Sequence, residues 1–255
     1  MVEKKEETIL EEEVIPAEAE TGIKKTNMGG WNPKTEIGRE IKSGKITNID
    51  EVLDKGEKIL EAEIVDFLLP NLDQSLLEVG QSKGKFGGGK RSIWRQTQKK
   101  TREGNKAKFA TMVAVGNKDG YVGLGFGDAK ETVPAREKAI RKSKLNIIKI
   151  RRGCGSWACG CKTPHSIPFE VEGKMGSSVV KLIPAPRGTG LCIQEECKKI
   201  LQLAGITDVY SKARGKTATR LNLLKACFNA LQKLSQVKIK HDQVEPRGIV
   251  EGSKK

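Results

Sequence analysis

The chain has 255 residues, of which 36% are hydrophobic and only 4% aromatic, and 47 Lys and Arg face 32 Asp and Glu, a formal charge of +15. This length allows one large domain or two small ones with tails, and the positive charge indicates a polyanionic partner. We expect no secretory signal peptide, because the first twenty residues lack a basic start and a sufficient apolar run. We expect no membrane span, because no apolar run approaches the roughly 18 residues needed.

The amino-terminal part of the chain contrasts with the rest in charge. Residues 1–20 hold eight Glu and two Lys, so residues 1–30 are predicted to form an acidic, disordered tail. Residues 31–86 are predicted to be an extension with short helices near 50–53 and 64–69. A loop rich in Gly and Lys over residues 83–89 joins this extension to the next segment.

The next segment, residues 87–152, is patterned as a β-β-β-α unit. Strands are predicted over residues 93–99, 109–115 and 121–126, because apolar residues alternate in the second and a turn at Asn117–Gly120 separates the last two. A helix is predicted from Val133 to Ile150, with its basic residues largely off the apolar face.

Residues 153–236 are predicted to form a second small α+β domain of order β-β-α-β-α. A Cys/Gly loop over 153–164 precedes a strand from Ile167 to Val171, a turn at Gly173–Gly176 and a partner strand from Val179 to Ile183. A helix near Cys192, a strand at Asp208–Tyr210 and a helix from Thr217 follow. Residues 237–255 are predicted to be a flexible tail.

The basic residues gather in two blocks. Lys83 to Lys108 contains ten Lys and Arg with one acid, and Arg136 to Arg152 contains eight with one acid. On a strand edge and a helix of one unit, these charges would form a surface that follows a phosphate backbone. The alternative is that these residues form an ordinary solvated helix face without a nucleic-acid partner. The near absence of acids in both blocks makes this the weaker interpretation.

Three glycine-rich stretches resemble nucleotide-binding loops without meeting their requirements. After Gly84 to Lys90 the magnesium-binding Ser or Thr is replaced by Arg91, and the fingerprint at Gly123, Gly125 and Gly127 has Asp128 in a required position. Gly215-Lys216-Thr217 lacks the earlier glycine. We therefore expect no enzyme and no small-molecule substrate. The glycines at 123–127 are interpreted as letting the backbone approach RNA phosphates, or as relieving turns.

A cluster of soft ligands is the sharpest local motif. Cys154, Cys159, Cys161 and His165 lie within twelve residues, a set that suits a structural zinc, with glycines that let the loop close. A Gly-rich turn with incidental thiols is an equally weighted alternative. Cys192, Cys197 and Cys227 are expected to be small core residues of helices, reduced in a cytoplasmic protein.

Two further basic stretches precede predicted helices, at Arg187–Gly190 and Lys212–Thr217. Free N–H groups at a helix start favour phosphate, so both are candidate RNA contacts.

Several collinear segments resemble the family of the universal small-subunit ribosomal protein five, in its archaeal and eukaryotic branch. They are residues 109–127 (FATMVAVGNKDGYVGLGFG), 144–153 (KLNIIKIRRG), 164–176 (PHSIPFEVEGKMG), 182–190 (LIPAPRGTG) and 203–209 (LAGITDV), with residues 31–53 resembling that branch's extension. The cysteine loop resembles the archaeal version. The loop between Gly80 and Arg91 departs from the family pattern.

The resemblance implies a double-stranded-RNA-binding-like domain followed by a second domain, and a structural place in the cytoplasmic small ribosomal subunit. It implies contact with small-subunit ribosomal RNA and neighbouring ribosomal proteins near the channel through which messenger RNA enters. There the family aids subunit assembly and decoding accuracy, and incoming messenger is a further candidate partner. A free RNA-binding regulator is the competing binding function, and a nucleotide hydrolase the competing enzyme.

The candidate RNA-binding residues come from the resemblance and from charge. By resemblance, Arg95, Gln98, Lys99, Lys100 and Arg102 fall in an RNA-facing hairpin, Arg151 and Arg152 end a helix, and Arg187 and Arg214 match Gly-rich turns. Charge adds Lys90, Arg91, Lys106, Arg141, Lys144, Lys212 and Lys216.

Overall fold

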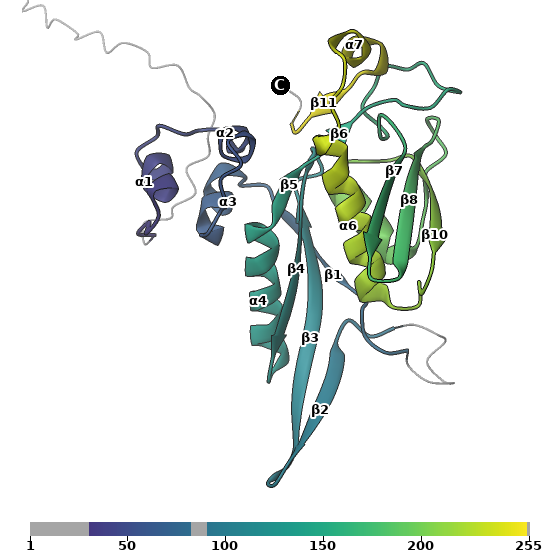
Figure 1. Ribbon diagram of the computed structural model, residues 1–255. Helices are drawn as coiled ribbons and strands as arrows, with labels where there is room; N and C mark the ends of the chain where they lie inside the picture. The colour runs from purple at the N-terminus through teal and green to yellow at the C-terminus, as the bar shows by residue number, and fades with distance from the viewer. Residues whose placement is uncertain (1–30, 83–90, 254–255) are drawn as a thin grey trace, which may run out of the picture.

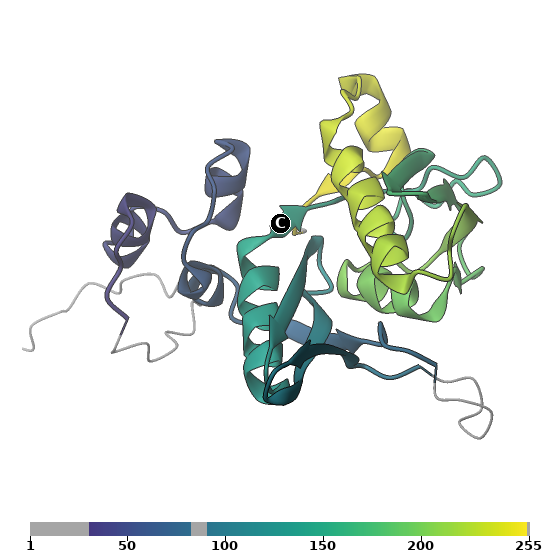
Figure 2. The ribbon, with the colours of Figure 1, turned by 60° about the horizontal axis from the view of Figure 1, so that its bottom comes forward.

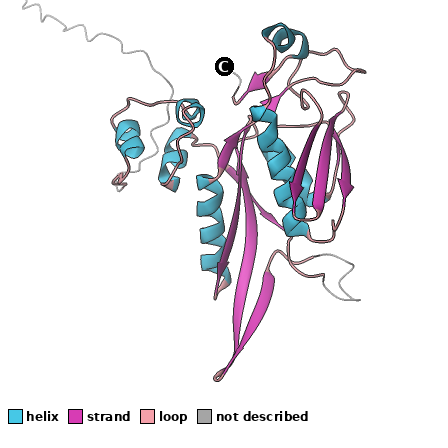
Figure 3. Ribbon diagram, in the orientation of Figure 1, coloured by secondary structure: helices cyan, strands magenta, loops and turns pink. Residues whose placement is uncertain are grey.

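The computed structural model describes residues 31–82 and 91–253. The predicted acidic tail at 1–30 and the Gly/Lys loop at 83–89, with Lys90, lie outside these ranges. The described chain forms two α+β domains side by side, with three short helices packed beside the first (Figures 1 and 3).

The first domain is an antiparallel sheet covered by one helix. Its strands are β1 (Asp73–Leu77), β2 (Arg95–Thr101), β3 (Gly104–Gly116), β4 (Tyr121–Ala129) and β5 (Ile147–Lys149), and its helix is α4 (Thr132–Leu145). The order is β1-β3-β4-β5, with β2 also paired to β3. The predicted β-β-β-α order is confirmed, with β1 and β5 added at the edges.

The predicted helix over 133–150 is too long. It ends at Leu145, and Ile147–Lys149 instead pairs with Tyr121–Gly123 of β4. Successive β-branched residues favour a strand, and here they supply the sheet's missing edge. Arg151 and Arg152 therefore lie in a further short strand, β6, instead of at a helix end.

Three glycines of β4 let α4 lie close against the sheet. A Cβ at Gly123, Gly125 or Gly127 would collide with helix backbone. Their interpretation as approaching phosphate or relieving turns was wrong, because they lie within a strand and face the helix.

The second domain has a four-stranded sheet with two helices. Its strands are β7 (Val171–Met175), β8 (Ser178–Pro184), β9 (Leu191–Cys192) and β10 (Val209–Arg214), in the order β7-β8-β10-β9, and its helices are α5 (Glu195–Leu203) and α6 (Arg220–Gln236). This confirms the predicted β-β-α-β-α order, with β9 added.

Two details of this domain correct the sequence prediction. Gly173 lies inside β7 against the backbone of α6, and the hairpin turns at Gly176 and Ser177. Cys192 is exposed on β9, not buried in a helix, whereas Cys197 and Cys227 are buried as predicted.

The two domains share one apolar core. Met112 and Leu124 from the first sheet belong to the same cluster as Leu201 of α5 and Phe228 of α6. Figure 2 shows α6 on the side of the second domain that is turned toward the first.

The amino-terminal extension has a smaller core of its own. Its helices are α1 (Glu36–Lys42), α2 (Ile49–Asp54) and α3 (Ala62–Leu68). Ile41, Val52 and Ile64 pack with Tyr121 and Ile147 of the sheet, which fixes the extension to the first domain.

The predicted flexible tail at the carboxyl end is wrong for residues 241–253. This segment forms η2 (His241–Gln243), α7 (Val244–Arg247) and β11 (Val250–Glu251), and β11 pairs antiparallel with β6 (Arg151–Arg152). In Figure 1 the segment lies above the ends of β5 and α6.

Candidate nucleic-acid interface and metal centre

The β2–β3 hairpin projects beyond the body of the first domain (Figure 1). Its register places Arg95, Lys99 and Lys106 on one face with Lys108, and Lys99 stands opposite Lys106. Like charges on facing residues destabilise a strand pair, so a bound anion would reduce the repulsion between Lys99 and Lys106. Two acids partly compensate, since Glu103 pairs with Lys106 at 2.8 Å and Asp128 pairs with Lys108.

The hairpin residues predicted to bind RNA are all exposed. They are Arg95, Gln98, Lys99, Lys100, Arg102 and Lys106. Arg91, just before this hairpin, is half-buried, and its Nη1 donates to the carbonyl of Ala218 at 3.0 Å.

Helix α4 presents a second basic surface. Arg141 is exposed as predicted, and Arg136, Lys138 and Lys142, which were not among the candidate residues, are exposed on the same helix. Their position on the same predicted helix as Arg141 could have identified them as candidate RNA contacts. Lys144 is different: its ammonium is 2.7 Å from the carboxylate of Asp66 in α3, and its side chain is only 18% exposed.

Arg151 and Arg152 are bound inside the protein. The Arg152 side chain is 6% exposed, and its Nη2 donates to Asp119 Oδ1 at 2.5 Å and to the Gly252 carbonyl at 2.9 Å. Arg151 pairs with Glu251 and donates to the Val237 carbonyl. A contact between Arg152 and RNA, as the sequence predicted, is incompatible with this burial; both arginines join β6 to the carboxyl-terminal segment.

The second domain exposes the remaining predicted cations, Arg187, Lys212, Arg214 and Lys216. The amides beside Arg187 are not free, because Gly188 N and Gly190 N donate to Asp208 Oδ1 at 3.1 and 2.8 Å. Strand β9 also separates this loop from α5. The predicted phosphate site on open helix-start amides is therefore wrong at Arg187–Gly190.

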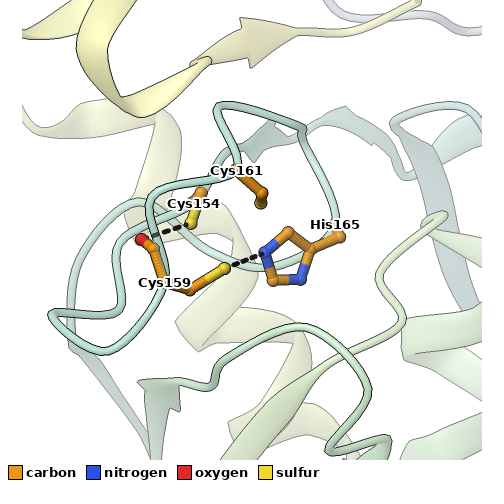
Figure 4. A group of neighbouring side chains, drawn as sticks. All are labelled: Cys154, Cys159, Cys161 and His165. Atoms are coloured by element: carbon orange, nitrogen blue, oxygen red, sulfur yellow. Dashed lines mark hydrogen bonds between the residues drawn. The ribbon is translucent and has the colours of Figure 1, made fainter.

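Cys154, Cys159, Cys161 and His165 converge in the loop that precedes the second domain (Figure 4). Their ligand atoms all lie within 4.8 Å of one another, and Cys159 Sγ is 3.9 Å from His165 Nε2. Three sulfurs and one imidazole at this spacing can surround a single ion, and zinc binds such sets tetrahedrally. The chemistry and geometry of the four residues fit a metal.

Hydrogen bonds around the cluster prepare it for a cation. His165 Nδ1 is 2.8 Å from Asp208 Oδ2, an arrangement that leaves Nε2 as the ligand atom. Hydrogen bonds from Thr163 lower the pKa of the Cys161 thiol to about 6, whereas burial raises the pKa of the Cys154 thiol to about 11. This lowering favours the thiolate form of Cys161, which is the form that binds metal.

The base of the loop is held by backbone. Gly153 and Ser166 exchange two hydrogen bonds of 2.9 and 3.0 Å, and Cys154 N donates to the Arg247 carbonyl at 2.8 Å. At the other end, Trp157 is 99% exposed and lines a groove with Pro186 and Tyr210. Trp157 is not among the residues predicted from the sequence, although its place in a Gly-rich loop could have indicated an exposed aromatic side chain.

Within the described ranges, no helix combines the length and apolar character that crossing a membrane requires.

Two protein families match the chain. The N-terminal domain of ribosomal protein S5 matches residues 93–151, and the C-terminal domain of ribosomal protein S5 matches residues 173–244.

Curated relatives match nearly the whole chain. The small ribosomal subunit protein uS5 of Nanoarchaeum equitans is 51% identical over 227 residues, covering 89% of this chain and 97% of the relative. The proteins of the same name from Methanosphaera stadtmanae and Methanocaldococcus jannaschii are each 46% identical, covering 88% and 89% of this chain and 92% and 97% of the relatives. The chain therefore belongs to the archaeal branch of the ribosomal protein S5 family, a family of structural, non-enzymatic proteins, as its motifs predicted.

Proposed function

We propose that this chain is a cytoplasmic structural constituent of the small ribosomal subunit that binds its ribosomal RNA near the channel through which messenger RNA enters. There it contributes to subunit assembly and decoding accuracy. The observation that carries the proposal is the projecting β2–β3 hairpin, whose cations face one another and are exposed. RNA phosphates supply the anions that such a surface needs.

The proposed RNA surface is smaller than the sequence alone suggested. It comprises exposed residues of the hairpin, α4 and the second domain: Arg95, Gln98, Lys99, Lys100, Arg102, Lys106, Arg141, Arg187, Lys212, Arg214 and Lys216. Lys144, Arg151 and Arg152 are left out of it, because each is paired with an acid of another element.

The hairpin can be tested by the salt dependence of RNA binding. In a triple variant, Arg95, Lys99 and Arg102 are each replaced by Gln, which keeps a polar side chain without the charge. Because each lost phosphate contact reduces the slope of log affinity against log salt by about 0.7 to 0.9, the slope should fall by about 2.

The matched control replaces Lys34, Lys55 and Lys58 by Gln, which removes three exposed charges from the extension. This control should leave the slope nearly unchanged. Equal slopes for the native protein and the hairpin variant on small-subunit RNA would refute the hairpin as the contact.

Decoding and assembly need a measurement in cells. A strain that carries the hairpin variant should accumulate fewer complete small subunits and misread a stop-codon reporter more often than the control strain. Co-sedimentation of the native chain with small subunits separates this function from that of a free RNA-binding regulator, which would remain in the unbound fractions.

Neighbouring ribosomal proteins are proposed partners of the groove beside Trp157. Its lining includes Phe169, Pro186 and Tyr210, and aromatic side chains of this kind are enriched in protein interfaces. Cross-linking at a photoreactive residue placed at position 157 should yield protein adducts in assembled subunits; RNA adducts alone would contradict this assignment. Incoming messenger remains a proposed partner of the basic surface.

We also propose that the cysteine cluster holds one structural zinc ion. The convergence of four ligand atoms within 4.8 Å supports this. Elemental analysis should find about one zinc per chain, and Cys159→Ser should lose it. Cys192→Ser, which removes an exposed thiol outside the cluster, should retain it. A metal-free native protein would end the proposal.

A further inference from the structure

We infer that Asp208 links the metal centre to the basic loop, residues 187–190, so that the bound ion holds Arg187 in position for RNA. The inference deepens the proposed function, since it rests on the metal and on an RNA contact at Arg187. The linked elements are distant in sequence: the cluster is at 154–165, the loop at 187–190, and Asp208 lies directly before β10.

Four donors lie within hydrogen-bonding distance of the Asp208 carboxylate, and one of them, the Thr207 hydroxyl, shares its single proton with the His165 carbonyl. Oδ1 accepts from Gly188 N at 3.1 Å and Gly190 N at 2.8 Å, while Oδ2 accepts from His165 Nδ1 at 2.8 Å and Thr207 Oγ1 at 2.9 Å. Only a carboxylate has two oxygens that both accept, and an amide in its place keeps one. One buried group therefore serves the metal ligand and the loop together.

On the metal side, the backbone also ties His165 to this carboxylate. The His165 carbonyl accepts from Thr207 N at 2.9 Å and from Asp208 N at 3.2 Å. When Nδ1 donates to Asp208, Nε2 faces the sulfurs, so an ion bound there fixes the imidazole plane and with it the carboxylate. Figure 4 shows the ring turned toward Cys159.

On the loop side, both hydrogen-bonded amides belong to residues in the left-handed region. Gly188 has φ +88° and Gly190 has φ +74°, so this backbone is costly for other residues and easy for glycine to leave. The two hydrogen bonds to Asp208 hold Gly188 and Gly190 in this backbone conformation. Arg187 precedes them, is exposed, and lines the same cleft as His165 and Asp208.

Amide hydrogen exchange on the full chain tests the link. Exchange at Gly188 and Gly190 is measured by NMR with zinc bound and after removal by a chelator, with zinc content followed in the same samples. We expect removal to speed exchange at these two amides at least tenfold. Val180 and Leu182 in the buried centre of β8 should keep their protection, which shows that the domain stays folded.

Two variants separate the link from metal binding. His165→Cys offers four thiolates and should keep zinc, but lacks the nitrogen that bonds Asp208, so both amides should exchange fast with the ion present. Asp208→Ala, which removes both acceptor oxygens, should exchange fast whether or not zinc is bound. Glu172→Gln, an exposed carboxyl change in β7, should behave as the native protein.

The outcomes distinguish the link through Asp208 from the proposed metal binding and the proposed RNA contact at Arg187. A zinc-loaded native protein whose Gly188 and Gly190 exchange does not change on zinc removal would overturn the link alone. A chain that binds no metal would overturn the metal proposal and the link together. If the link holds, zinc removal should weaken binding of small-subunit RNA as much as Arg187→Gln does, and should have no further effect on that variant.

Discussion

At the scale of single residues, charge in the sequence does not distinguish surface cations from internal ones. Arg102 and Arg152 both belong to basic blocks, yet Arg102 is exposed on the hairpin and Arg152 is buried against Asp119 and Gly252. The acid that pairs with Arg152 lies 33 residues away and its backbone acceptor 100 residues away. No local pattern in the sequence reveals such partners.

Replacing these two arginines by Leu should give opposite results. Arg152→Leu should lower the free energy of unfolding by about 2 kcal/mol, because it removes the donor to the buried Gly252 carbonyl and the ion pair with the half-exposed Asp119. It should leave the salt slope of RNA binding unchanged. Arg102→Leu should reduce the slope with little change in stability. Urea unfolding and RNA titrations check both; an unaltered stability in Arg152→Leu would contradict the internal role.

The glycines of β4 provide a second contrast. Gly125→Ala should destabilise the protein by about 1 to 3 kcal/mol, because its Cβ would meet the backbone of Ala139 and Ser143 and push α4 from the sheet. Gly160→Ala adds the same methyl group where it meets nothing within 4 Å and should be nearly neutral. Thermal unfolding of both variants measures the difference, and equal melting temperatures would refute this packing.

At the scale of elements, most of the fold could be predicted and its edges could not. Phe109–Val115 was recognised as a strand and forms the carboxyl-terminal half of β3, although both of its faces are buried. Asp73–Leu77 of β1 begins with three polar residues and shows no alternation. Strand β5 has only three residues and continues an apolar pattern that suits a helix. Both edge strands form because β3 and β4 offer partners, which is tertiary information.

In the candidate site, too, features local in sequence could be predicted and those formed by distant segments could not. The cysteine cluster and the hairpin cations could be singled out as candidates because each set is local in sequence. Asp208 was missed as a functional residue because its partners, His165 and Gly190, belong to other segments. The fold of the segment at 241–253 was missed because its pairing with β6 spans about a hundred residues.

The amino-terminal extension should show a defined pH dependence. The Glu61 carboxylate accepts from Trp31 Nε1, Lys34 N and Thr35 N at 2.7 to 2.9 Å, and although burial opposes this, these bonds lower the pKa of Glu61 below its usual value. A lowered pKa means that the carboxylate stabilises the fold above its unfolded pKa and that this stability is lost as pH falls through the folded pKa.

Glu61→Gln measures this contribution. The native protein should exceed the variant in free energy of unfolding above about pH 5, and the difference should shrink below about pH 4. Urea unfolding across this range checks the trend. Glu63→Gln, a neighbouring change on α3, serves as the control, and a difference that grows on acidification would contradict the assignment.

At the scale of the whole molecule, the two domains are joined by their core. Because Met112 and Leu124 pack in one cluster with Leu201 and Phe228, unfolding either domain exposes apolar surface of the other. We expect a single cooperative transition, with equal calorimetric and van't Hoff enthalpies. Two resolved transitions in scanning calorimetry would show that the match to two families reflects two independent folding units.

The pairing of β11 with β6 also has a consequence for biosynthesis. Gly252, whose carbonyl binds Arg152, is translated 100 residues later. At about 5 to 20 residues per second, this interval lasts roughly 5 to 20 s. Throughout it the guanidinium of Arg152 and the amide of Cys154 lack their carboxyl-terminal acceptors. The pairing of β6 with β11 is therefore one of the last contacts that the described chain can form during synthesis.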